Sequence, residues 1–248
     1  MNRLNKLFSI ILISIFIVSC GNELSSTYCN GETSINTSLN GDQNTATFLN
    51  KSYKVETEGD VWNEAMGEKN LQFFDASSTS YPSNAAKLLN YLNCGDPSLS
   101  LISSIEGNSL NNTGYKENTS AYALMLGNGS SSMGSMLLNF SIPVSKIEIE
   151  VQSYYKPYPD YTNPGNYVKN ADMYSVLAVG TSVNPKIEVI DMSINSYSAD
   201  DLPITSTRSI EFSKGINQVI FTGIGNEEFS AGSFAPGRIA FHYIAFYY

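Results

Sequence analysis

The sequence predicts a mainly β protein, an antiparallel β-sandwich with one short helix near residues 83–92. Three observations carry this prediction. Tyrosine and phenylalanine are abundant, with 16 and 12 residues among 248, and aromatic side chains favour strands. Short runs of alternating apolar and polar residues follow one another after residue 120. Serine, threonine, asparagine and glycine separate these runs, as turn residues do in sandwiches.

The elements before residue 120 are fewer. Residues 71–74 form a short apolar strand candidate, and residues 83–92 are rich in helix formers. Ser83 is a candidate N-cap, Pro82 precedes it, and Asn93 and Gly95 follow as stop signals, so we expect one short helix here. Residues 97–115 fit neither period.

The clearest strand covers residues 146–152. Ile147, Ile149 and Val151 alternate there without exception with charged or amide residues. This period of two is typical of a strand with one buried and one solvent-facing side. Further strands are predicted over residues 121–126, 136–142, 174–179, 186–192, 208–212, 217–221 and 238–248.

The first 20 residues have the pattern of an export leader. A basic start with Arg3 and Lys6 precedes about twelve nearly uninterrupted apolar residues, which suit a signal peptide but are too short to span a bilayer. The run ends in Ile17-Val18-Ser19-Cys20, which resembles the bacterial lipobox. The resemblance implies cleavage after residue 19 and acyl chains such as palmitate on Cys20. The alternative is an ordinary secretory peptide with a chance cysteine.

This leader divides the chain into a signal peptide over residues 1–19, a segment over 20–50 and a domain over 51–248. Residues 20–50 are polar, with hardly any large apolar residue before Phe48, and such a composition cannot bury enough surface to offset its ordering entropy. We therefore expect a flexible polar tether. The sandwich domain is best supported over residues 120–248.

Charge limits the partners. The full chain carries −9, and removing the leader with its two basic and no acidic residues makes the exported part −11. Such a surface argues against nucleic acid and anionic lipid as partners. The expected location is the extracytoplasmic face of a cell membrane, held by the lipid on Cys20.

Two cysteines remain besides Cys20. Cys29 and Cys94 could form a disulfide in an oxidising compartment, or they could be two free thiols. The sequence leaves both alternatives open.

The strings LMLGNGSS (residues 124–131), GSMLLNF (134–140), VSKIEI (144–149) and RIAFHYIAFYY (238–248) together resemble a recurrent module. It is similar to β-sandwich domains on lipoproteins and secreted proteins of Firmicutes and related bacteria. The resemblance covers roughly residues 70–248 and implies a jelly-roll sandwich of the galactose-binding type. It implies no activity and no site residues.

A tyrosine- and proline-rich stretch over residues 154–167 departs from that module. Prolines exclude a central strand, so we expect a stiff loop at one end of the sandwich. Its rings could lie against the C–H faces of sugars, while hydroxyl and carboxylate groups bind sugar hydroxyls. The candidate ligand-binding residues are Tyr155, Tyr158, Asp160, Tyr161 and Tyr167. Alternatively, these tyrosines cover an edge of the sandwich.

Catalytic signals are weak. The sole histidine, His242, lies in the last strand, so neither a histidine-rich zinc site nor a catalytic triad is expected. Aspartates could form a hydrolase pair or a structural calcium site at a loop, although no Asp-x-Asp-x-Asp run is present. These aspartates are Asp160, Asp172, Asp191, Asp200 and Asp201.

The expected function is therefore a non-catalytic, surface-anchored module that binds carbohydrate or another extracellular polymer, with no cofactor. Two alternatives remain. One is a structural or adhesive lipoprotein that binds protein partners of the envelope. The other is a glycoside hydrolase that uses aspartate carboxylates.

Overall fold

The computed structural model describes residues 29–33, 51–67, 70–95, 100–114, 122–127, 134–154, 158–159, 167–168, 175–193, 204–224 and 238–248. The leader and Cys20 lie outside these residues. Within them the protein is mainly β, as the sequence predicts, and its strand pairs are antiparallel.

The strands are β1 Cys29–Thr33, β2 Lys51–Glu56, β3 Leu71–Phe74, β4 Ile102–Asn108, β5 Leu110–Gly114, β6 Tyr122–Leu126, β7 Ser135–Ser153, β8 Tyr158–Pro159, β9 Tyr167–Val168, β10 Val176–Gly180, β11 Glu188–Asp191, β12 Thr205–Ile224 and β13 Ile239–Tyr247. The helices are α1 Gly59–Met66 and α2 Pro82–Leu92.

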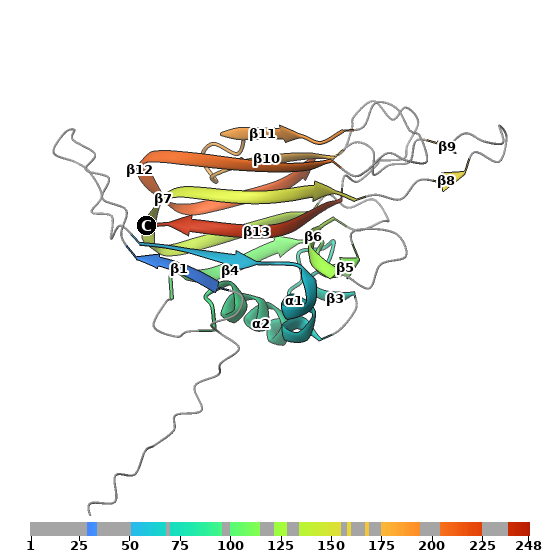
Figure 1. Ribbon diagram of the computed structural model, residues 1–248, viewed down its shortest axis with the longest axis horizontal. Helices are drawn as coiled ribbons and strands as arrows, with labels where there is room; N and C mark the ends of the chain where they lie inside the picture. The colour runs from blue at the N-terminus through green and yellow to red at the C-terminus, as the bar shows by residue number, and fades with distance from the viewer. Residues whose placement is uncertain are drawn as a thin grey trace, which may run out of the picture.

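Two long strands, β7 and β12, connect the layers of the sandwich (Figure 1). The first part of β7 pairs with β4 and with the last part of β12, whose other edge carries β10 and then β11. The second part of β7 pairs with β13 and with the first part of β12. On its far edge, β13 pairs first with β6 and then with β2.

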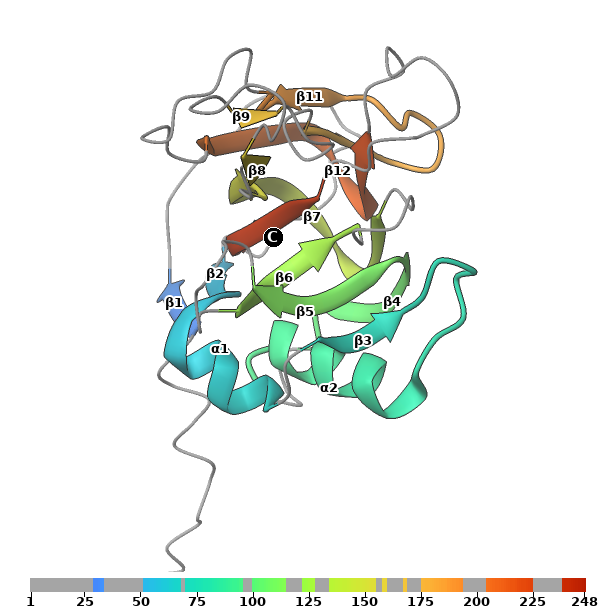
Figure 2. The ribbon, with the colours of Figure 1, turned by 90° about the vertical axis from the view of Figure 1, so that its right-hand side faces the viewer.

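The sequence predicted two strands in place of each long one. In β12, the turn-like residues 213–215 coincide with register shifts between Glu211 and Gln218, and Gly215 has a φ of 67°. In β7, Pro143 falls between the two runs of pairing. A bulge bends a strand without ending it, so these residues curve β7 and β12 around the core, as Figure 2 shows.

Aromatic side chains join the two layers across the core. Phe221 of β12 contacts Phe241 of β13 edge to face, with ring centroids 5.3 Å apart. Phe140 of β7 contacts Phe246 of β13 at 5.7 Å. Ile147, Ile149 and Val151 are fully buried in the same cluster, so the alternation identified the inward side of this strand correctly.

Both helices lie on one side of the molecule, next to β3 (Figure 2). Helix α2 confirms the predicted helix, although it begins at Pro82 with Tyr81 as the N-cap. Proline fits this first helical position because its missing N–H has no helical partner there. Helix α1 was not predicted. It buries Trp62 and Met66, and this burial stabilises a helix too short to be stable alone.

The prediction of a flexible tether over residues 20–50 is wrong for Cys29–Thr33. This segment is β1, paired with β2 from Cys29 opposite Val55 to Thr33 opposite Lys51. Cys29 also forms a disulfide with Cys94, with a Cα–Cα distance of 5.7 Å. Composition gave no sign of order because the ordering comes from the covalent link and from backbone pairing, not from apolar side chains in the segment.

Because several tyrosines are buried, we expect the protein to lose stability in alkali. Burial raises the pKa of Tyr243 to about 12, and its hydrogen bond to Glu148 acts in the same direction. Burial, followed by the nearby Tyr248, also raises the pKa of Tyr53. The folded state therefore prefers the neutral phenols. The contribution of these neutral phenols to the free energy of unfolding is complete below about pH 10, the pKa of tyrosine in the unfolded chain. It is lost as the pH rises through the higher pKa of the folded state.

We expect Tyr53→Phe to leave the free energy of unfolding at pH 7 unchanged or slightly higher, because the buried Tyr53 hydroxyl has no hydrogen-bond partner among the described residues. Above about pH 10 the variant should lose less stability than the wild type. Tyr243→Phe is the matched control, since it removes a 3.0 Å hydrogen bond to Glu148 and should cost about 1 kcal/mol at pH 7. Urea denaturation at both pH values measures this. A loss at pH 7 from Tyr53→Phe as large as the control's would contradict the prediction.

Candidate functional site

The tyrosine-rich segment leaves the sandwich where β7 ends. Within it, Tyr158 of β8 lies opposite Val168 of β9, and Pro159 lies opposite Tyr167. The chain therefore folds back on itself, and the backbones of Tyr158 and Tyr167 become neighbours. Figure 1 places this small hairpin beyond the end of the main sheet. Tyr155, Asp160 and Tyr161 lie outside the described residues.

Tyr154, the first residue of this segment, is held in place by Arg238. The backbone N–H of Tyr154 donates to the carbonyl of Arg238 at 3.0 Å. The Arg238 guanidinium carbon lies 3.4 Å from the centroid of the Tyr154 ring, which is a cation–π contact. Arg238 also connects to the start of β10, because the Ser175 hydroxyl donates to its carbonyl at 3.3 Å.

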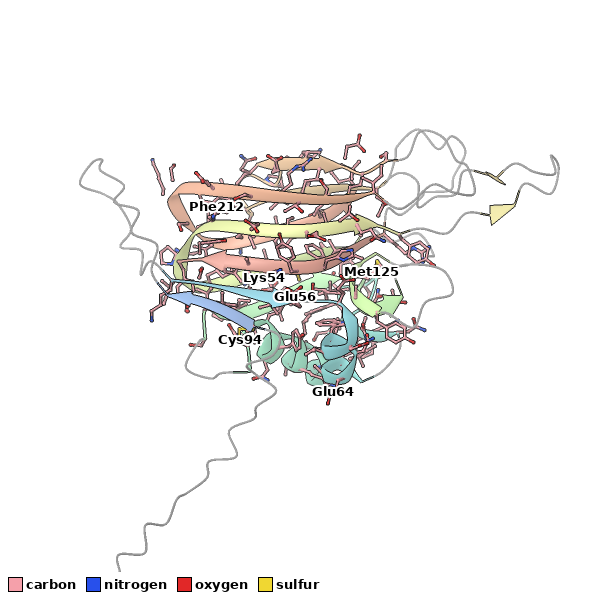
Figure 3. The ribbon with its side chains drawn as sticks, in the orientation of Figure 1. Lys54, Glu56, Glu64, Cys94, Met125 and Phe212 are labelled. Atoms are coloured by element: carbon pink, nitrogen blue, oxygen red, sulfur yellow. A yellow bond between two sulfur atoms is a disulfide. The ribbon has the colours of Figure 1, made fainter. Side chains whose placement is uncertain are left out.

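A small apolar cluster lies under the Tyr154 ring. Ala123 and Met125 of β6 and Ala240 of β13 are fully buried, and Tyr154 packs against them. Met125 is labelled at this end of the molecule in Figure 3. This cluster is separate from the main core and lies on the other side of the sheet, because Leu124 and Leu126 of β6 belong to the main core.

Two buried polar side chains come directly before Tyr154. Gln152 is 5% exposed and Ser153 is 0% exposed. Neither the Gln152 Nε2 nor the Ser153 Oγ has a hydrogen-bond partner among the described residues. A buried polar group without a partner costs about 1–3 kcal/mol, so such groups in a protein call for an explanation.

The sequence alone did not indicate that Gln152 is buried. Gln152 stands at an outward position of the alternating strand, where an amide is normally solvated. It lies between Ala240 of β13 and Thr205 of β12 in the strand order. Only the pairing of distant strands shows that this position is buried. Arg238 opens the last strand in the sequence, and the structure stacks its guanidinium on Tyr154.

The sole histidine lies elsewhere, in the last strand and next to the start of α1. His242 is at a bulge of β13, between Phe241 and Tyr243, which have consecutive partners on β7. Its Nδ1 lies 2.5 Å from the Glu58 Oε1, and Glu58 is the N-cap residue of α1. Thr57 adds to this junction, with its N–H donating to the His242 carbonyl and its hydroxyl to the Phe241 carbonyl. The arrangement fastens α1 to the sheet.

Of the aspartates named above, only Asp191 lies among the described residues. Asp191 ends β11, and its Oδ1 accepts the Ser193 N–H at 2.8 Å, a local turn contact. Asp160, Asp172, Asp200 and Asp201 lie outside the described ranges. In those ranges, no group of three or more His, Cys, Asp or Glu side chains is placed to hold a metal ion.

The outer side of the sheet carries a second set of aromatic and charged residues. The Lys54 ammonium lies 3.8 Å from the Tyr243 ring centroid, and the Lys146 ammonium lies 3.6 Å from that of Tyr247. Lys54 also pairs with Glu56, and both are labelled in Figure 3. Each of these two rings therefore has a cation next to it.

No protein-family model matches the chain, and no curated protein matches it. None of the helices in the described ranges is long and apolar enough to cross a bilayer.

Proposed function

We propose that this protein is a membrane-anchored, non-catalytic binding module for carbohydrate or another extracellular polymer. The lipobox pattern at Cys20 supports the anchor, which places the module on the extracytoplasmic face of the cell membrane. The binding surface in this proposal is the end of the sandwich at which β7 finishes. It includes the segment with Tyr155, Tyr158, Asp160, Tyr161 and Tyr167.

One observation carries the proposal: the tyrosine-rich segment begins directly at a buried amide and hydroxyl without partners among the described residues. Gln152 and Ser153 supply these groups, and Tyr154 next to them is held by Arg238. Polyhydroxylated ligands match this chemistry, because their hydroxyls both donate and accept while their C–H faces pack on aromatic rings. A rigid aromatic surface also loses little conformational entropy on binding.

The variant Tyr155→Ala/Tyr158→Ala/Tyr161→Ala tests the surface. We expect it to bind at least tenfold more weakly to a glycan that the wild type binds, which corresponds to about 1.4 kcal/mol. A glycan array identifies the ligand, and calorimetric titration measures the affinity. Tyr81→Ala is the matched control, because Tyr81 is an exposed tyrosine next to α2. Equal binding by the triple variant and the wild type would refute the proposal that this surface binds the glycan.

A second variant examines the buried amide. Gln152→Met keeps the size of the side chain and removes its donor. Stability should stay equal or rise, because a buried group without a partner is removed, while ligand affinity should fall. A variant that loses stability and keeps its affinity would show that Gln152 has a purely structural role.

The second candidate is an adhesive lipoprotein that binds an envelope protein. It is favoured by the exposed aliphatic residues Val183, Ile187, Val189 and Ile204, of which Val189 is in β11, an edge strand of the sheet. Pull-down from native envelopes separates the two candidates: a protein partner that sugars do not displace favours adhesion.

A further inference from the structure

The Cys29–Cys94 disulfide shortens the connection between the lipid anchor and the domain. Nine positions separate Cys20 from Cys29, and 31 separate Cys20 from Lys51, where the predicted domain begins. A fully extended chain spans at most about 3.6 Å per residue. The maximum reach is therefore about 32 Å to Cys29 but about 110 Å to Lys51.

Both cysteines belong to the body of the domain. Cys94 is 3% exposed in the main core, and Cys29 packs against that core. Cys94 follows α2, where its N–H donates to the Tyr91 carbonyl. The preceding Asn93 binds the start of β4 through two hydrogen bonds, one donated to the Ile102 carbonyl and one accepted from the Ile102 N–H. The attachment point of the disulfide is thus fixed to both a helix and a strand.

Strand β1 by itself would be a weak attachment. It has five residues, Cys-Asn-Gly-Glu-Thr, and pairs through one edge with β2. Apart from the cysteine, the five residue types include no large apolar one. Strand pairing without apolar burial is marginal in water, so the disulfide is the contact that holds β1 in place.

We propose that the disulfide sets the effective membrane tether at the nine positions between Cys20 and Cys29, so that the domain stays close to the bilayer. The proposal rests on the anchoring at Cys20 that belongs to the proposed function. The tether then enters the molecule beside the helices, where Figure 3 labels Cys94. The β8–β9 hairpin lies at another end of the molecule (Figure 1), so a short tether leaves the tyrosine-rich end open to ligand.

The position of an inserted linker tests the tether in the full lipidated protein. About 15 Gly/Ser residues are inserted either between Cys20 and Cys29 or between residues 34 and 50, a length that extends a flexible chain appreciably. Trp62 of α1 is the sole tryptophan, so energy transfer from it to dansyl-labelled lipid headgroups in phosphatidylcholine vesicles reports the height of the domain. The first insert should lower the transfer by roughly twofold or more, and the second should leave it unchanged.

This experiment distinguishes failure of the proposed anchor at Cys20 from failure of the proposed short tether. Wild-type protein that does not bind the vesicles would refute the anchor at Cys20, and with it the tether. Bound protein in which both inserts lower the transfer equally would refute the short tether alone, because the effective connection would then run on to Lys51.

A cleavage experiment gives a second measurement that needs no cysteine variant. A site for a sequence-specific protease is placed between residues 34 and 50 of the lipidated protein. After cleavage the domain should remain on the vesicles through the disulfide, and a dithiol reductant should then release it. The same site placed between Cys20 and Cys29 is the control and should release the domain without reductant. Release from the first position without reductant would overturn the proposal.

Discussion

Replacing both disulfide cysteines, as in Cys29→Ser/Cys94→Ser, is expected to lower the free energy of unfolding by about 4 kcal/mol. The bridge joins residues 65 positions apart, and in the chain-entropy account a longer closed loop restricts the unfolded chain more. The loss would be a large part of the total, since domains are stable by only about 5–15 kcal/mol. Urea denaturation of the chain beginning at Gly21 measures the difference.

The wild type treated with a dithiol reductant should unfold at the same urea concentration as the double variant. The variant itself should not respond to the reductant, which makes it the internal control. A wild-type midpoint that does not change on reduction would mean that the bridge contributes nothing to stability.

Truncation of the sole tryptophan, Trp62→Ala, is expected to cost about 3–5 kcal/mol. Trp62 is 0% exposed and packs edge to face on Tyr91 of α2, with ring centroids 5.0 Å apart. Its Nε1 donates to the Asn112 Oδ1 of β5 at 2.8 Å. One side chain thus connects both helices to the sheet, and its removal would leave a cavity and break that hydrogen bond.

Thermal and urea unfolding followed by far-ultraviolet circular dichroism measure this effect without tryptophan fluorescence. Val183→Ala is the control: Val183 is 93% exposed, so its truncation should change stability by less than about 0.5 kcal/mol. Trp62→Phe keeps one aromatic ring but loses the Nε1 donor and part of the indole volume, so it should lie between the two. A loss below about 1 kcal/mol for Trp62→Ala would contradict the role assigned to this residue.

Local patterns predicted the elements that local forces determine. The alternation of Ile147, Ile149 and Val151 reflects a strand with one buried side, and the composition of residues 83–92 reflects a helix with its own stop signals. Both appear in the structure because tertiary contacts reinforce the local preference. Helix α1 has no such strong preference, and it was missed because the burial of Trp62 and Met66 stabilises it.

For the candidate site too, the sequence indicated one part and only the structure showed the other. The tyrosine-rich segment was proposed from composition alone, because prolines and aromatic residues together are typical of a loop. Gln152 and Arg238 were not recognised as neighbours of that segment. The two residues are 86 positions apart in the sequence, and only the antiparallel pairing of β7 with β13 brings them to the same end.

The sequence by itself determined the β class, the inward side of the central strand, the position of α2 and the leader pattern ending at Cys20. These features depend on residues within one turn or one strand of each other. The tertiary structure alone decided that β7 and β12 continue through their bulges, that Cys29 meets Cys94, and that an outward-facing Gln152 is buried. Each of these depends on which distant segments pair, and that choice is a property of the whole packed chain.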